Sequence, residues 1–320
     1  MSKVSVVIPM FNEQQHIGRT LGAVQAAAVQ AGLDWELLVV DNGSTDNGPQ
    51  IAAAAGARVL SGAHLTIAAL RNLGARHARG DWLAFVDADV EVPPTWLTLW
   101  QQLRQADRAD VLALACDTPV QAPWFARAWQ RRTLSGGQGE LRREWLPTTN
   151  LCMTRDWFER VGGFDERLRT GEDKDFGLRL NRAGARLLSV SPPLAWHWGY
   201  EHSWTEWWGK ERWRQGSHLQ LIKESSALRH LRFPLLCCAV FLLNLAAVPA
   251  LLSGAPGLAA GLLLPGMVAA SGLSLRQGWR HRDGLFILQL GLLHWIRLHS
   301  GALALLSALA NRSMRRPARG

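Results

Sequence analysis

The sequence contains few cysteines, and none of them has the spacing of a metal site. The four cysteines, at positions 116, 152, 237 and 238, are scattered over 320 residues. This scatter predicts buried free thiols in a reducing compartment. The N-terminus shows no signal-peptide pattern, because Met1 to Lys3 lead directly into a strand-like run. We therefore expect the first domain to lie in the cytosol.

Acidic residues are scarce in the C-terminal third. Residues 1–204 carry 21 Lys or Arg and 22 Asp or Glu, whereas residues 205–320 carry 14 and 4. The basic residues there stand beside long apolar runs, and the chain has no nucleic-acid-binding motif. This pattern favours an anionic membrane surface as partner and argues against nucleic acid.

Two apolar runs, Phe233–Ser253 and Pro256–Leu275, are each about as long as a bilayer core requires. The short link between them fits only a tight hairpin. Basic residues flank the pair on both sides, so the positive-inside rule places both outer flanks in the cytoplasm. These flanking residues are Lys223, Arg229, Arg232, Arg276, Arg280 and Arg282. The alternative is that the runs are buried helices of a soluble domain.

Residues 284–310 are also apolar, but His294, Arg297 and His299 interrupt them. A third span would place the basic tail with Arg312, Arg315, Arg316 and Arg319 outside, so we expect an interfacial helix, with a third span as the alternative. Upstream, the closely spaced tryptophans at 204, 207 and 208 share one helical face. They predict either an amphipathic helix at the lipid headgroups or a helix packed on the protein core.

Short apolar runs alternate with helical patterns in the first half of the chain. The predicted strands are 4–9, 35–41, 57–60, 82–87 and 109–116, and the predicted helices are 14–31, one from about 45, and 66–79. This alternation predicts an α/β fold with a mainly parallel sheet. Ligands bind such sheets at the carboxyl ends of the strands.

Two carboxylates, Asp87 and Asp89, follow the apolar strand that starts at Trp82. Because residues i and i+2 of a strand point to the same side, we expect both carboxylates to converge on one hard cation, Mg²⁺ or Mn²⁺. Asp-x-Asp alone is common by chance. A second acidic pair, Glu172 and Asp173, follows Gly171 and either caps a helix or supplies a general base.

Taken together and in order, these motifs resemble the family 2 glycosyltransferases, which have the GT-A fold. The resemblance covers about residues 3–216. The motifs that carry it are Val4–Pro9 with Asn12-Glu13, Val39–Asp46, Arg71–Gly74, Asp87–Asp89 and Gly171–Asp173.

The resemblance implies a UDP- or GDP-sugar donor and a bound Mn²⁺ or Mg²⁺. It implies that Pro9, Glu13 and Asp41 contact the nucleoside, and that Arg71 reaches the diphosphate or braces the acidic site. Asn42 stands where the family often has a second acid, which leaves the base preference open. Metal ligands would be Asp87, Asp89 and His197, although a histidine between two tryptophans can equally be a core residue.

On the acceptor side, the resemblance implies Asp173 as general base and Glu172 as a supporting residue. Thr149 and Asn150, in a short strand over 148–150, match the family's acceptor region. Arg212 and Trp213 resemble part of the Gln-x-x-Arg-Trp motif of processive polysaccharide synthases, but Gly209 replaces the glutamine.

The predicted organisation is a GT-A catalytic domain over 1–216, a basic juxtamembrane linker over 217–232, a transmembrane hairpin over 233–275, and a basic loop, helix and tail over 276–320. The predicted function is a metal-dependent, inverting glycosyltransferase of the cell envelope. Its catalytic domain would lie on the cytoplasmic face of the inner membrane and act on a lipid, lipid-linked or glycan acceptor. The alternatives are a polyprenyl-phosphate glycosyltransferase, a processive synthase subunit, and a non-catalytic scaffold.

Overall fold

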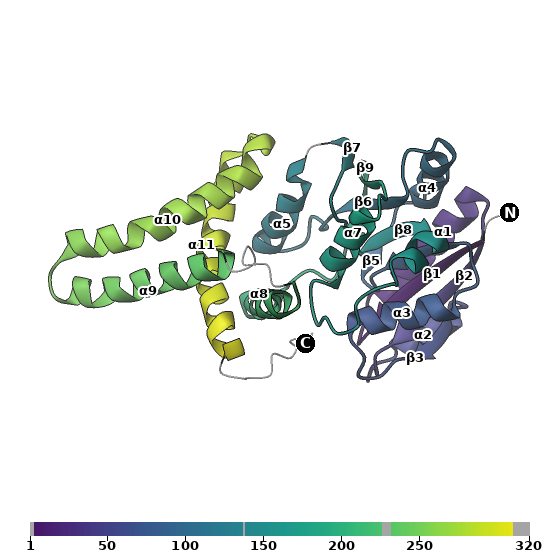
Figure 1. Cartoon of the computed structure of the whole chain (residues 1–320), viewed down its shortest axis with the longest axis horizontal. Coiled ribbons are helices and arrows are strands. Elements are labelled where there is room, and N and C mark those ends of the chain that lie inside the picture. The colour runs from purple at the N-terminus through teal and green to yellow at the C-terminus, as the bar shows by residue number, and fades with distance from the viewer. Residues whose placement is uncertain (1–2, 137, 226–231, 310–320) are drawn as a thin grey trace. The chain divides into compact units, whose positions relative to one another are not determined.

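The computed structural model describes residues 3–136, 138–225 and 232–309 (Figure 1). The chain divides into two compact units. Met1–Val120 and Gly136–Tyr200 form the sheet unit, and Gln121–Ser135 and Glu201–Gly320 form the helical unit. This division differs from the predicted boundary at residue 216, because α5 (Trp124–Arg131) and α8 (Trp204–Ser225) both belong to the helical unit.

The sheet has the strand order β3-β2-β1-β4-β8-β6-β9-β5, with β7 paired to β9. The strands are β1 (Lys3–Met10), β2 (Asp34–Asp41), β3 (Arg58–Ser61), β4 (Trp82–Val86), β5 (Val90–Glu91), β6 (Val111–Asp117), β7 (Gly139–Arg142), β8 (Asn150–Thr154) and β9 (Leu187–His197). The half from β3 to β4 is parallel, as the alternation of strands and helices predicted. Antiparallel β8 follows β4, so residues just before β8 lie beside the carboxyl end of β4.

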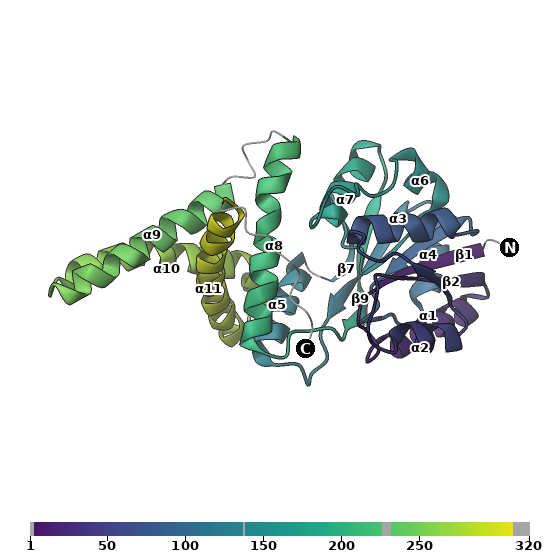
Figure 2. The same cartoon turned by 90° about the horizontal axis from the view of Figure 1, so that it is seen from below.

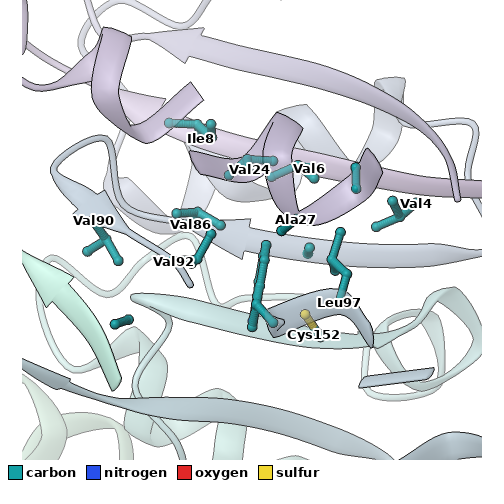
Figure 3. Packing of buried hydrophobic residues seen from close by; sticks show 14 of the residues in the cluster. Val4, Val6, Ile8, Val24, Ala27, Val86, Val90, Val92, Leu97 and Cys152 are labelled. Atoms are coloured by element: carbon teal, nitrogen blue, oxygen red, sulfur yellow. The ribbon is translucent and has the colours of Figure 1, made fainter. Parts of the chain in front are cut away.

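Helices cover both faces of the sheet (Figure 2). On one face lie α1 (Ile17–Ala31), α2 (Gly48–Ala54) and α4 (Trp96–Gln105); on the other lie α3 (Ile67–His77), α6 (Arg155–Arg160) and α7 (Glu172–Arg182). Figure 3 shows the core on the face that α1, α2 and α4 cover, where Val24 and Leu97 of the helices pack with Val6 and Val86 of the strands. Burying such side chains contributes about 1.5–3 kcal/mol each to the stability of the sheet that carries the site.

Helix α3 lies very close to β1 because residue 74 is glycine. A Cβ at Gly74 would lie 2.2 Å from Cγ1 of Val7, so no other residue fits without a shift of the helix. At the start of the helix, Thr66 Oγ1 accepts a hydrogen bond from the Ala69 amide at 3.2 Å. These two contacts fix where α3 presents Arg71.

The helical unit contains a hairpin of α9 (Arg232–Leu252) and α10 (Pro256–Gly278), which run side by side (Figure 1). Helix α11 (Gly284–Leu309) packs against α8, α9 and α10. Among the described residues, two helices are long and apolar enough to cross a bilayer, Arg232–Leu252 and Pro256–His281, and only 22% of the most apolar stretch of each is buried. They coincide with the two predicted spans, and α11 is not among them.

One part of the third apolar run and one part of the tryptophan cluster pack on the protein, whereas Leu285, Leu288, Leu292 and Leu306 of the run are 49–74% exposed. His294 and Ala304 of α11 are fully buried, and a Cβ at Gly301 would meet Sγ of Cys237 at 2.6 Å. Trp207 is fully buried against Trp129, whereas Trp204 is 41% exposed. The tryptophan-rich helix therefore packs on the protein through Trp207.

Two smaller predictions have clear outcomes. The four cysteines are free, three of them buried and Cys238 half-buried. The predicted strand over 148–150 was misplaced, because β8 begins only at Asn150. The predicted basic positions Arg229, Arg312, Arg315, Arg316 and Arg319 lie outside the described residues.

Candidate active site

Asp87 and Asp89 lie in a turn, not on a strand. β4 ends at Val86, and the Val90 amide donates to the Asp87 carbonyl at 3.1 Å, which closes the turn. The expectation that alternation along a strand points both carboxylates to one side was therefore wrong. Asp89 is 4% exposed, whereas Asp87 is half-buried at the carboxyl end of the sheet.

Arg71 joins the two acidic sites. Its Nη2 donates to Asp87 Oδ1 at 2.9 Å and its Nη1 donates to Glu172 Oε1 at 2.7 Å, while the Arg71 side chain is 4% exposed. Burial alone would lower the pKa of Arg71, but Asp87 and Glu172 more than offset burial and raise that pKa. The arginine therefore braces the acidic site, which is one of the two roles predicted for it.

Asp89 and His197 also come together. Val90 pairs with His197 across β5 and β9, and His197 Nε2 lies 3.5 Å from Asp89 Oδ1. Carboxylate oxygen and imidazole nitrogen are suitable ligands for Mn²⁺. The described part of the chain contains no preassembled group of three or more metal-binding side chains. Two of the three predicted ligands thus adjoin, while Asp87 is held by Arg71.

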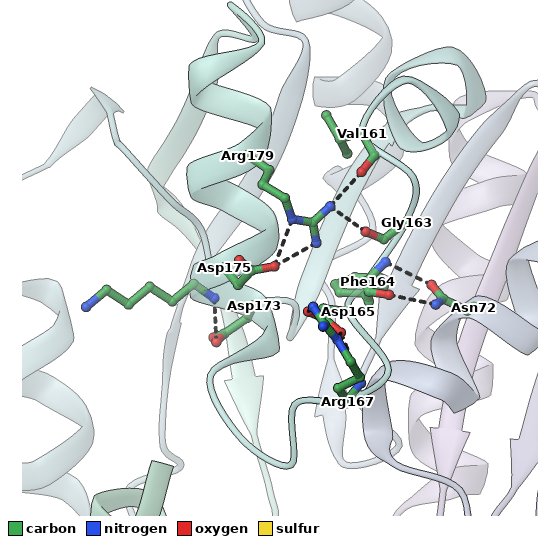
Figure 4. Close-up of polar contacts among 10 residues, drawn as sticks. Asn72, Val161, Gly163, Phe164, Asp165, Arg167, Asp173, Asp175 and Arg179 are labelled. Atoms are coloured by element: carbon green, nitrogen blue, oxygen red, sulfur yellow. Dashed lines mark hydrogen bonds and ion pairs between the residues drawn. The ribbon is translucent and has the colours of Figure 1, made fainter. Parts of the chain in front are cut away.

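Asp173 lies in the first turn of α7, which begins after Gly171 in a left-handed conformation with φ of 77°. The Lys174 amide donates to Asp173 Oδ1 at 2.7 Å (Figure 4). Burial and the neighbouring Glu172 raise the pKa of Asp173 to about 7. A carboxylate with that pKa is suited to accept a proton near neutral pH.

The residues predicted to contact the nucleoside meet where β1 and β2 end. Asp41 accepts from Ser44 Oγ at 2.5 Å and from the amides of Gly43 and Ser44 at 3.2 Å, so its carboxylate shapes the turn after β2. Glu13 is 7% exposed, and its carbonyl accepts from the first turn of α1. Pro9 pairs with β2 near its end. Their contact with a nucleoside stays a prediction.

Asn72 has a positioning role that the sequence did not reveal. Its side chain donates to the Phe164 carbonyl at 2.8 Å and accepts from the Phe164 amide at 2.9 Å (Figure 4). Gly163 comes so close that a Cβ there would lie 2.8 Å from Asn72 Oδ1. Arg179 of α7 donates to the carbonyls of Val161 and Gly163 at 2.6 and 2.8 Å. Asn72 and Arg179 thus hold the loop that leads into α7.

The residues predicted for the acceptor region belong to two different units of the chain. Asn150 is fully buried and pairs with the backbone of Leu114 at 2.6 and 3.0 Å, next to an irregularity in β6. This contact gives Asn150 a structural role. Thr149 is half-buried, and its carbonyl accepts from the Asp87 amide at 3.2 Å. Arg212 and Trp213 lie on α8 in the helical unit.

Three curated proteins similar to this chain are an O-antigen biosynthesis protein and two transferases by name. O-antigen biosynthesis protein RfbC of Myxococcus xanthus is 32% identical over 59% of this chain and 17% of its own length. Glycosyltransferase AglE of Haloferax volcanii is 28% identical over 61% of this chain and 66% of its own length. Undecaprenyl-phosphate 4-deoxy-4-formamido-L-arabinose transferase of Salmonella enteritidis is 33% identical over 29% of this chain and 31% of its own length. The match thus spans less than two thirds of each relative.

Solved structures share the fold. Mannosyltransferase PcManGT from Pyrobaculum calidifontis, solved with GDP-Man and Mn²⁺, has a TM-score of 0.61 at 16% identity and covers 98% of this chain and 88% of its own. TarS 1–349 of S. aureus has a TM-score of 0.53 at 17% identity over 98% of this chain and 93% of its own. The model of glycosyl transferase family 2 matches residues 5–166, which include most of β1, Arg71 and the turn after β4. The chain therefore belongs to glycosyl transferase family 2 and has the GT-A fold.

Proposed function

We propose that the chain moves one sugar from a UDP- or GDP-sugar to a hydroxyl of a lipid, lipid-linked or glycan acceptor, with inversion at the anomeric carbon. The bridge from Arg71 to Asp87 and Glu172 carries this proposal. It joins the carboxyl end of β4, where a donor diphosphate would lie, to the first turn of α7, where Asp173 stands. One site then holds a leaving-group region and a base.

The proposed donor site includes a divalent cation. Asp89 and His197 adjoin, and with Asp87 they offer the oxygen and nitrogen ligands that Mn²⁺ accepts; Mg²⁺ would favour the two carboxylates. Such a cation would neutralise the charge that develops on the diphosphate leaving group. The mannosyltransferase with the same fold was solved with GDP-Man and Mn²⁺, which supports this part of the proposal.

Asp173 is the proposed general base. The acceptor hydroxyl loses a proton as its oxygen attacks the anomeric carbon, and the Asp173 carboxylate accepts that proton. Glu172, already bonded to Arg71, keeps a negative charge beside Asp173 and so helps to hold its pKa near 7. One base and no enzyme nucleophile correspond to a single displacement with inversion.

The proposed location is the cytoplasmic face of the inner membrane of the cell envelope. Helices α9 and α10 are long and apolar enough to form a transmembrane hairpin, and Arg276 and Arg280 near its second end suit an anionic cytoplasmic surface. The boundaries at 233 and 276 for hairpin and tail belong to this proposal, whereas the predicted start of a linker at 217 lies within α8.

The substitution D173N tests the base. Transfer should fall by about 100-fold or more, the usual contribution of general base catalysis, while donor binding stays near the wild-type affinity. Label transfer from a donor panel and donor-dependent thermal stabilisation measure the two quantities. D156N is the matched control, because Asp156 is an exposed acid in the first turn of α6. Unchanged turnover in D173N would exclude Asp173 as the base.

The same experiment separates the hydroxyl acceptor from a polyprenyl phosphate. The name of the Salmonella relative motivates this second candidate. A phosphate acceptor is already ionised and needs no base, so D173N would keep its turnover. The labelled product would then be a phospholipid that mild acid cleaves.

A further inference from the structure

Two arginines of the helical unit pair with one buried carboxylate, and a third is coupled to it electrostatically. Arg214 of α8 and Arg297 of α11 approach the two oxygens of Glu211 at 3.7 and 3.6 Å, and the Glu211 side chain is 2% exposed. Arg132 follows α5, in the short helix Arg132–Gly136, and is electrostatically coupled to all three. We call Arg132, Arg214 and Arg297 the arginine cluster.

The carboxylates around the cluster are shared among several cations. Glu201 binds Arg214 at 3.1 Å and Lys210 at 3.4 Å, and Glu206 binds the same lysine at 3.3 Å. The three arginines and Lys210 thus face three carboxylates, Glu201, Glu206 and Glu211.

Arg132 differs from Arg214 and Arg297, because the described residues give it no carboxylate partner. Its side chain donates to the Trp129 carbonyl and lies 3.8 Å from the centre of the Trp129 ring, and no described carboxylate pairs with it. Burial lowers the pKa of Arg132 to about 9, with Arg297 and Arg214 acting in the same direction and Glu211 opposing them. A guanidinium remains charged at neutral pH even so. A further anion beside Arg132 would stabilise this charge.

The surroundings of the cluster indicate what kind of molecule carries that anion. Arg297 lies 4.4 Å from the ring centre of Phe233, in the first turn of α9, and 5.6 Å from that of Trp129. Helix α9 is one of the two helices able to cross a bilayer, so its first turn would lie at headgroup depth. A lipid phosphate occupies that depth and has apolar chains beside it.

We propose that the arginine cluster binds the phosphate or diphosphate group of a membrane lipid that carries the acceptor. Guanidinium groups form paired hydrogen bonds with phosphate oxygens, and Arg132 has N–H donors to spare. Trp129 keeps the Arg132 fork in place from one side. The identification of this lipid as the acceptor rests on the proposed function, whereas the binding site itself does not.

The test measures binding, with no turnover. The purified full chain is kept in detergent with EDTA, so that metal-dependent diphosphate binding in the sheet unit does not contribute. Affinity is measured for farnesyl diphosphate, farnesyl phosphate, farnesol and inorganic diphosphate, by titration and by thermal stabilisation. The variants are R132Q, R132K and, as matched control, R127Q, because Arg127 is an exposed arginine on the same α5.

Farnesyl phosphate and farnesyl diphosphate should both bind to the wild type and to R127Q. They should bind much more tightly than farnesol or inorganic diphosphate. R132Q should bind them about tenfold more weakly, the usual effect of one hydrogen bond to a charged group, and R132K should fall between. If R132Q lowers the stability of the ligand-free protein, the affinity of R132K tests the proposal instead, because lysine keeps the positive charge but loses the paired N–H donors of the guanidinium.

Equal binding by R132Q and R127Q would show that the cluster only joins α5, α8 and α11. If inorganic diphosphate binds as tightly as farnesyl diphosphate, the proposal of a lipid ligand is wrong, and the cluster is a site for a free anion. Donor hydrolysis with Mn²⁺, measured on the same preparation, tests the proposed function separately. Its failure would leave the lipid-binding result intact.

Discussion

The replacement of Arg71 by methionine gives the sharpest test of the acidic site. R71M keeps an unbranched apolar stem of similar length and removes the guanidinium that pairs with Asp87 and Glu172 at 2.9 and 2.7 Å. The Glu172 side chain is 11% exposed, so it would remain as a nearly buried carboxylate without its cation. Removal of one partner from a buried ion pair costs about 3–5 kcal/mol.

The lower end of that range applies here, because the Asp87 side chain is 30% exposed and water compensates for part of the loss. A destabilisation of about 3 kcal/mol lowers Tm by about 6–12 °C in a domain of 150–250 residues. The double variant R71M/E172Q should recover part of this loss, since it removes the stranded charge as well. R58M is the control, because Arg58 is an exposed arginine of the same unit.

Thermal unfolding of the four proteins in one detergent, followed by circular dichroism, measures these shifts. A parallel Mn²⁺ titration should show tighter metal binding by R71M together with slower transfer, because Asp87 loses a positive neighbour and also its fixed orientation. If R71M unfolds within 1 °C or so of R58M, the buried bridge does not stabilise the fold. If the double variant is no more stable than R71M, the reasoning from a stranded Glu172 is wrong.

Two further predictions concern a proton and a glycine. Because burial and Glu172 raise the pKa of Asp173 to about 7, the folded chain keeps a proton there that the unfolded chain releases above about pH 4. The stability of the wild type should therefore fall as pH rises from about 4 to 7. D173N lacks this proton, so the Tm of D173N minus the Tm of the wild type should grow from about pH 4 to 7 and then stay constant. Transfer by the wild type should rise with pH up to about 7. If the difference in Tm between D173N and the wild type does not change with pH, this assignment of the proton to Asp173 is wrong. G74A should destabilise the sheet unit by about 1–3 kcal/mol, because the new Cβ meets Val7 at 2.2 Å. G22A, which meets nothing within 4 Å on α1, should stabilise by about 0.5–1 kcal/mol, and similar denaturant midpoints for the two would refute the close-approach argument.

The strands of the parallel half could be predicted because each is an apolar run bounded by turn residues. β1, β2, β3 and β4 lie within about a residue or two of the predicted ranges, as is usual for such boundaries. The path of the chain after β4 could not be predicted, because that turn depends on β8 and β9, which follow much later in the sequence. The alternation argument for Asp87 and Asp89 failed for this reason.

The contacts that assemble the site were hidden by distance along the chain. Arg71 and Glu172 are 101 residues apart, and Asn72 and Phe164 are 92 apart. Local patterns can suggest that Arg71 is near an acid, but not that it joins Asp87 to Glu172; its contact with the diphosphate stays a prediction. The sequence also did not reveal that the Asn150 side chain pairs with the backbone of β6 beside an irregularity; its predicted place in the acceptor region stays a prediction.

The discontinuity of the sheet unit has a consequence for how the chain is made. Residues 121–135 are translated between the two parts of the sheet unit, yet α5 packs with helices that the ribosome produces only after residue 200. Until Trp204 and Trp207 emerge, Phe125 and Trp129 have no ring partners from α8. The nascent chain thus exposes an aromatic surface late into synthesis, which a chaperone or the bilayer itself must cover. A gene cut once after residue 200 would make that exposure permanent.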